Sequence, residues 1–170
     1  MRPPLLIFAV IGVVRPAAPL AAQAPVEQRI TALIARMTLA EKLGQLNLPT
    51  FDPNAANPSQ AELVRRGLVG GFLNLDGADA TRAMQKIAVE QSRLHIPLLF
   101  GQDVIHGYRT TFPIPLAEAS AFDPALAEAT AKFAAREARA AGLNWTFAPM
   151  VDIARDPRWG RIAEGSGEDP

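Results

Sequence analysis

The sequence predicts an α/β fold, in which a parallel sheet is covered by helices. Three short apolar segments alternate with two helical segments between residues 68 and 151. The apolar segments are continuous, and this pattern is typical of strands that are buried on both faces. Strand–helix–strand units of this kind join parallel strands through right-handed crossovers. No linker-like stretch interrupts the alternation, so we expect one domain after the N-terminal segment.

That N-terminal segment, residues 1–24, is predicted to be a secretory signal peptide. Arg2 precedes an apolar run over residues 5–14, and small residues lead to Ala22-Gln-Ala24. A basic start, a short apolar stretch and an A-x-A-like cleavage site form the signal pattern. The apolar run is shorter than the roughly 20 residues that cross a membrane. An uncleaved anchor is the alternative, because Arg15 interrupts the apolar region.

Residues 25–170 are then expected to form a periplasmic or secreted domain that has no membrane contact after cleavage. The chain has 170 residues with 17 basic and 17 acidic side chains, so no nucleic acid partner is expected. It contains no cysteine, which excludes disulfides and thiolate metal sites. Nucleotide-binding glycine loops and the HExxH and G-x-S-x-G motifs are also absent.

Three helices and a loop are predicted ahead of the first strand. Apolar residues at helical spacing over residues 26–37 predict the first helix. The capping box Thr38-Leu-Ala-Glu41 opens the second, and Ser59-Gln-Ala-Glu62 opens a third that Gly67 ends. Proline and asparagine residues predict a loop over residues 51–59.

The alternating part begins with a strand over residues 68–75, a helix over 79–94 and a second strand over 96–100. A long helix follows over residues 123–142, with an aspartate N-cap, a proline at its first position and a glycine at its end. The third strand is predicted over residues 145–151.

Charges four residues apart mark the solvent face of that long helix, with Glu128 followed by Lys132 and then by an arginine. Leu126 and Phe133 lie on the other side of the helix.

An aspartate follows each predicted strand: Asp76, Asp103 and Asp152. Because parallel strands end at the same edge of a sheet, these residues mark a candidate ligand site. Asp103 leaves a buried strand directly and is placed to accept two hydroxyl hydrogen bonds, as in sugar recognition. A carboxylate that caps the next turn is the alternative. His106 belongs to no histidine cluster, and we expect it to be packed and hydrogen-bonded.

The C-terminal segment carries three arginines spaced by three, which include Arg158 and Arg161. One or two of them are predicted to form fork pairs with Asp152, Asp156 or Glu164 and to hold the loop closed, while another reaches a ligand.

Trp159, between these arginines, is either a stacking platform for a sugar or a buried side chain at the sheet edge. Glu164, Glu168 and Asp169 could supply the carboxylate pair of a glycosidase. Their spacing does not show that they face one another, and a solvated acidic tail is the favoured reading.

Three long blocks of this sequence resemble a known family. They are MTLAEKLGQL (37–46), IPLLFGQDVIHGYRTTFPIPLAEASAFDP (96–124) and GLNWTFAPMVDIARDPRWGRIAEGSGEDP (142–170). In this order they are similar to the N-terminal domain of glycoside hydrolase family 3, above all to its bacterial periplasmic β-glucosidase branch. The resemblance covers essentially all of residues 25–170.

The resemblance implies the N-terminal part of a (β/α)8 TIM-like barrel, incomplete because a full barrel needs roughly 250 residues. It implies retaining, exo-acting hydrolysis of β-linked glucosides or oligosaccharides, with no metal and no cofactor. It assigns Asp103 and Arg161 to substrate binding and gives Arg158 and Glu164 a loop-supporting role.

The family's nucleophile and general acid/base lie in segments that these blocks do not include. We therefore expect no catalytic residue in this chain, no hydrolysis by it alone, and an exposed sheet edge with an uncovered apolar face. The alternatives are a non-catalytic carbohydrate-binding protein and a half-barrel that a partner chain completes. Within the family, β-xylosidase and β-N-acetylhexosaminidase activities stay open.

Overall fold

The computed structural model describes residues 25–52 and 59–169. The predicted signal peptide and most of the predicted loop over 51–59 lie outside the described residues. The elements, in chain order, are α1 (Val26–Arg36), α2 (Leu39–Gln45), α3 (Ser59–Arg65), β1 (Gly71–Leu73), α4 (Ala78–Gln91), β2 (Leu99–Gln102), α5 (Pro115–Ala119), α6 (Pro124–Ala140), β3 (Trp145–Thr146), and the 3-10 helices η1 (Pro157–Trp159) and η2 (Ile162–Glu164). None of the described helices is long and apolar enough to cross a membrane.

The sheet has three strands in the order β1-β2-β3, and both pairs are parallel, as predicted. Gly71 pairs with Leu99, and Gly101 pairs with Trp145. Helices α4 and α6 are the crossovers between successive strands. The strands are shorter than the apolar segments that predict them, because the paired ladder between β2 and β3 covers only two residues of each strand.

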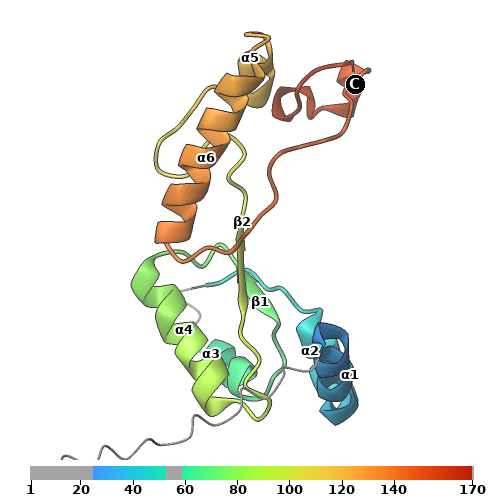
Figure 1. Cartoon of the computed structure of the whole chain (residues 1–170), viewed down its shortest axis with the longest axis vertical. Coiled ribbons are helices and arrows are strands. Elements are labelled where there is room, and N and C mark those ends of the chain that lie inside the picture. Colours follow the sequence, from blue (N-terminus) through green and yellow to red (C-terminus); the bar gives the residue numbers. More distant parts are fainter. Residues whose placement is uncertain (1–24, 53–58, 170) are drawn as a thin grey trace, which may run out of the picture.

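The molecule is elongated, and strand β2 runs between its two ends (Figure 1). Helices α1 to α4 surround β1 at one end, while α5, α6 and the C-terminal segment form the other. The core lies at the first end, where Phe72 is fully buried and Val69 and Leu75 are 2% exposed. Phe51 packs against Phe72 in a T-shaped, edge-to-face arrangement, with ring centroids 5.8 Å apart. Burial of such side chains stabilises the fold by about 1.5–3 kcal/mol each.

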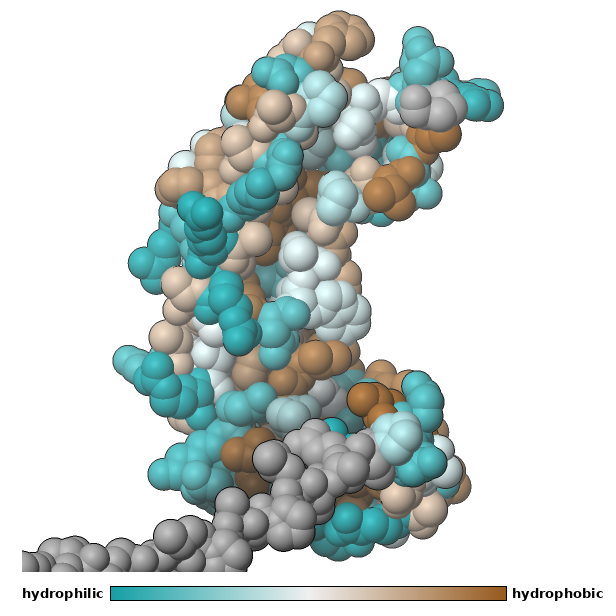
Figure 2. Space-filling model, viewed as in Figure 1, coloured by the Kyte–Doolittle hydropathy of each residue, from teal (hydrophilic) through white to brown (hydrophobic). Residues whose placement is uncertain are grey.

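Large apolar side chains stay exposed over much of the molecule, as the sequence analysis expected. Figure 2 shows apolar patches among hydrophilic ones along its concave side. On α6, Leu126 and Phe133 are 43% and 46% exposed. Phe133 meets the Phe112 ring, with centroids 5.9 Å apart, and both apolar side chains are still partly exposed.

Two helix starts follow the predicted capping chemistry, while the side chain of Ser59, in the other predicted capping box, lies outside the described ones. In the Thr38–Glu41 capping box, the Glu41 amide donates to Thr38 Oγ1 at 3.2 Å and the Thr38 amide donates to Glu41 Oε2 at 2.8 Å. Asp123 caps α6 by accepting from the Ala125 amide at 2.9 Å. Gly142 follows the end of α6 with φ 93°. Only glycine adopts this conformation without strain.

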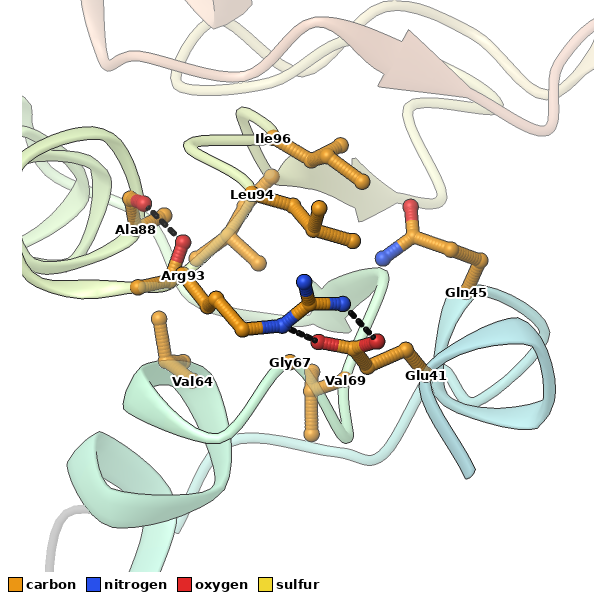
Figure 3. Close-up of a pocket in the computed structure, with 11 residues that line it drawn as sticks. Glu41, Gln45, Val64, Gly67, Val69, Ala88, Arg93, Leu94 and Ile96 are labelled. Carbon is orange, nitrogen blue, oxygen red and sulfur yellow. Dashed lines mark hydrogen bonds and ion pairs between the residues drawn. The ribbon is translucent and has the colours of Figure 1, made fainter. Parts of the chain in front are cut away.

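The capping-box carboxylate also forms an ion pair that joins two distant segments (Figure 3). Arg93, which follows α4, donates through Nε to Glu41 Oε1 at 2.9 Å and through Nη2 to the Arg36 carbonyl at 2.9 Å. Glu41 is 8% exposed. The Arg93 hydrogen bond, followed by that of the Thr38 amide, lowers the pKa of Glu41 from 4.5 to about 2.

The contact between Gly142 and α4 gives a first prediction. A Cβ at Gly142 would lie 2.0 Å from Thr81 Oγ1, whereas a Cβ at Gly160 (φ 88°) would meet nothing within 4 Å. Gly160→Ala should cost about 1–2 kcal/mol, the usual strain of a left-handed alanine. Gly142→Ala should cost a further 1–3 kcal/mol or so from overpacking. Urea denaturation measures both, and equal costs would show that Thr81 does not hold α6 in place.

The Glu41–Arg93 pair gives a second prediction. Because the folded-state pKa of Glu41 is depressed, its contribution to stability is fully present above about pH 4.5 and is lost as the pH falls towards 2. The urea midpoint of Glu41→Gln should therefore lie well below that of the wild type at neutral pH, and the two midpoints should converge near pH 2. Glu128→Gln, which removes an exposed pair with Lys132, is the control and should change the midpoint little at any pH.

Candidate functional site

An open cavity of about 440 Å³ lies where the chain leaves the carboxyl ends of β2 and β3. Two segments line it in equal shares. The first follows β2 and the second follows β3: Asp103, Ile105, His106, Ile114 and Pro115, and Phe147, Met150, Arg161, Ala163 and Glu164. The parallel pairing of Gly101 with Trp145 brings the two segments together. Helix α5 also contacts η2, so the two segments meet at the cavity.

Asp103 lies at this edge, two residues beyond Gly101, as the sequence predicts. Its side chain is exposed, and its carboxylate makes no hydrogen bond within the described part of the chain. Its negative charge contributes to the raised pKa of Arg161, which lines the same cavity. The alternative of a turn-capping carboxylate is therefore not what the structure shows.

Arg161 reaches the cavity from the loop between η1 and η2. Its Nε donates to Glu164 Oε1 at 3.1 Å and to Oε2 at 3.0 Å, and its Nη2 pairs with the same carboxylate. The Glu164 hydrogen bond, and then the charges of Asp152 and Asp103, raise the pKa of Arg161. The guanidinium also lies over the Trp159 ring, 5.9 Å from its centroid. Within the described residues, no hydrogen bond engages Nη1, which leaves this nitrogen free to donate to a ligand.

Arg158 forms the second fork pair in this loop, and its partner is Asp156. Its Nε donates to Asp156 Oδ1 at 2.9 Å and to Oδ2 at 3.0 Å, while its amide donates to Oδ1 at 2.9 Å. These bonds lower the pKa of Asp156 and raise that of Arg158. The predicted fork pairs are therefore present, but Arg158 lies outside the cavity lining, and its supporting role stays a prediction.

Several expectations for single residues differ from the structure. His106 is exposed and lines the cavity, and its ring makes no hydrogen bond within the described residues, so the prediction of a packed histidine is wrong. The next residue, Gly107, has φ 111°, a backbone conformation that favours glycine. Trp159 is 42% exposed, which rules out the buried alternative. Glu164 belongs to no solvated tail, because it binds Arg161, whereas Glu168 and Asp169 are exposed as expected.

The sequence analysis placed three strand-end aspartates at one site, and the structure brings only one of them into the cavity. Asp76 instead accepts a hydrogen bond from the Tyr108 hydroxyl. Asp152 is exposed and lies outside the lining, although its charge acts on Arg161. Phe147, which the sequence placed inside the third strand, also lines the cavity, together with Met150 at the predicted end of that strand.

No three histidine and carboxylate side chains gather as a metal site within residues 25–52 and 59–169. The polar groups of the cavity are one carboxylate that makes no hydrogen bond, an arginine–carboxylate pair and an imidazole, beside the apolar face of Phe147. Such a surface fits a polyhydroxylated ligand, because hydroxyl groups both accept from a guanidinium and donate to a carboxylate.

Comparison with known proteins identifies the family. The family profile described as "Glycosyl hydrolase family 3 N terminal domain" matches residues 38–170. This chain belongs to glycosyl hydrolase family 3. The matched region contains both segments that line the cavity.

Relatives of this family match the chain in sequence and in structure. The chain is 46% identical over 142 residues to a periplasmic β-glucosidase of Salmonella typhimurium, covering 82% of this chain and 18% of that protein. A putative β-xylosidase of Formosa agariphila is 30% identical over 165 residues, covering 85% of this chain and 22% of that protein. The solved β-glucosidase of Listeria innocua in complex with isofagomine superimposes with a TM-score of 0.72 at 37% identity, covering 85% of this chain and 21% of that one.

The chain spans about a fifth of the length of the curated relatives that it matches. The three parallel strands and their crossover helices are the N-terminal part of the TIM-like barrel of this family, as the sequence predicted. Two of the relatives are named as periplasmic enzymes.

Proposed function

We propose that this chain supplies part of the sugar-binding site of a β-glucosidase-type glycoside hydrolase, which acts on β-linked glucosides or oligosaccharides in the periplasm or outside the cell. One observation carries the proposal: Asp103 and Arg161, which lie 58 positions apart in the sequence, line the same cavity at the carboxyl ends of β2 and β3. In α/β barrels this edge of the sheet holds the active site.

Each side chain has a distinct role in the proposed site. The Asp103 carboxylate accepts hydrogen bonds from two neighbouring sugar hydroxyls, and Arg161 donates to a hydroxyl through Nη1. Glu164 fixes the direction of the guanidinium by holding its other edge. The Phe147 ring offers an apolar surface to the C–H groups of the sugar. Arg158 supports the loop through its pair with Asp156.

Structures of relatives support this proposal. The Listeria innocua enzyme is described in complexes with isofagomine, glucose and gluconolactone, and a D270A variant of it with laminaribiose. Other relatives are named β-xylosidase or β-N-acetylglucosaminidase, so these activities are the alternatives within the family. We propose that retaining, exo-acting hydrolysis requires carboxylates outside the described residues, and that this chain alone binds sugar without cleaving it.

Binding of isofagomine to the purified chain tests the proposed site. Asp103→Asn should weaken binding about tenfold or more, because it replaces charge-assisted hydrogen bonds with neutral ones. Arg161→Lys keeps the charge but loses the planar fork, and a similar loss is expected. Isothermal titration calorimetry measures the dissociation constants, with Asp169→Asn as the exposed control. Unchanged affinity in both variants, or no binding by the wild type, would contradict the proposal.

A second proposal concerns a partner: further barrel segments, on this polypeptide or on a separate one, cover the open side of the half-barrel. An apolar groove of about 650 Å³ lies between α6, the segment that follows β2, and β3, which pairs only with β2 among the described strands. Alanines of α6 and apolar residues of the flanking segments line much of it: Ala127, Ala131, Ala135, Ala138, Phe112, Leu143 and Trp145. An open strand edge beside such a groove fits the next strand and helix of a barrel.

Complementation tests this partnership. We expect the chain, mixed with the part of the Listeria innocua enzyme that lies beyond the aligned region, to hydrolyse an aryl β-glucoside. Ala131→Glu places a charge in the groove and should abolish the activity of the mixture. Ala129→Glu, an exposed position on the same helix outside the groove, should leave it unchanged. Hydrolysis by the chain alone, or none by the mixture, would refute the proposal.

A further inference from the structure

One wall of the cavity is an irregular loop, residues 103–114, that joins β2 to α5. It contributes Asp103, Ile105, His106 and Ile114 to the lining. Little regular structure holds it: one isolated bridge joins Ile105 and Gly107, and the Phe112 amide donates to the His106 carbonyl at 2.8 Å. These bonds close a turn over residues 106–112, and the lining residues lie at or beyond its two ends. The position of this turn therefore sets the position of the wall.

Glu137 of α6 binds this turn from outside the cavity. Its Oε2 accepts hydrogen bonds from the Arg109 amide at 3.0 Å and from the Thr110 amide at 2.8 Å. Its Oε1 accepts from the Thr110 hydroxyl at 2.8 Å. Both carboxylate oxygens are thus engaged by one turn, and the hydrogen bond from the Thr110 amide is the first cause of the lowered pKa of Glu137. Charge-assisted bonds of this kind are among the strongest in proteins.

Contacts on the other sides of the turn leave it few alternative positions. The Tyr108 ring packs against the core, and its hydroxyl donates to Asp76 at the end of β1. Phe112 meets Phe133 of α6 edge-on, with ring centroids 5.9 Å apart and an interplanar angle of 81°. The turn itself needs glycine at position 107, since a Cβ there would lie 1.9 Å from the Thr110 carbonyl oxygen.

We propose that Glu137 is a positioning residue of the candidate sugar site: by binding the backbone of residues 109 and 110, it fixes the loop wall that carries Asp103 against the wall that carries Arg161. The proposal rests on the proposed function. Glu137 is absent from the cavity lining, so it would act on a sugar only through the loop. Without its carboxylate, two backbone amides and a hydroxyl of the turn lose their partner, and the turn is free to move away from α6.

Two measurements on the purified chain test this role. Hydrogen exchange reports on the amides of Arg109 and Thr110, and an isofagomine titration reports on the cavity. In Glu137→Ala, both amides should exchange at least about tenfold faster, and isofagomine should bind about tenfold more weakly, because small misplacements of binding groups are costly. Glu137→Gln retains one oxygen that accepts from both amides, so it should restore most of the protection and most of the affinity.

Glu128→Ala is the matched control on the same helix, since Glu128 is exposed and pairs only with Lys132. It should match the wild type in both measurements and in its urea midpoint, whereas Glu137→Ala should lower the midpoint because it removes three charge-assisted hydrogen bonds. Unchanged exchange in Glu137→Ala overturns the proposal, and so does faster exchange with unchanged isofagomine affinity. If the wild type does not bind isofagomine, the proposed function and the sugar-positioning role fail together. This outcome differs from the others because the titration of the wild type alone reveals it.

Discussion

The parallel pairing of β2 with β3 is the constraint on which the rest of this structure depends. Only β2 is hydrogen-bonded to a strand on both sides within the described sheet, and it spans the distance between the two ends of the molecule (Figure 1). The register that sets Gly101 opposite Trp145 makes both strands end at the same level. Two segments that are far apart in sequence therefore face each other across one cavity. Glycine at position 101 suits this place, because a Cβ there would approach the Phe147 ring to 3.2 Å.

Four carboxylates of the described residues differ in what they bind. Glu41, Asp123 and Glu137 accept hydrogen bonds from backbone amides and so fix a helix start or a turn. Asp103 accepts none within the described residues and stays exposed at the cavity. A carboxylate that has no partner at the carboxyl edge of a parallel sheet is available to a ligand, whereas the others are already satisfied.

The distribution of apolar surface fits a part of a larger barrel. The core is concentrated around β1, where helices lie on both sides of the strand, and it thins towards α6 and β3. On that thinner end the exposed large side chains include Phe122, Phe133, Trp145 and Phe147. In a complete barrel of this family, the next strands and helices would lie beside β3, so the same residues that are exposed here would gain neighbours.

The sequence by itself determined the order of the strands and of the helices between them, two of the helix caps and the family, but not helix α5 or the two 3-10 helices. Caps and left-handed glycines are local: Thr38 with Glu41, Asp123, and Gly142 each act within a few residues, so their pattern is visible in the chain. The apolar runs predicted a parallel sheet for the same reason, and Asp103 was found because it directly follows one of them. Strand lengths were less predictable, since they depend on a partner strand elsewhere in the chain.

Only the tertiary structure decided which polar residues share a site. Asp76 accepts a hydrogen bond from Tyr108 and so does not join Asp103 at the cavity. The His106 side chain is exposed, and Glu137 binds a turn 27 residues earlier in the sequence. No periodicity or motif records such contacts, because they join side chains whose distance is fixed by strand register and helix packing. The sequence therefore fixes the local chemistry of each segment, while the sheet decides which segments meet.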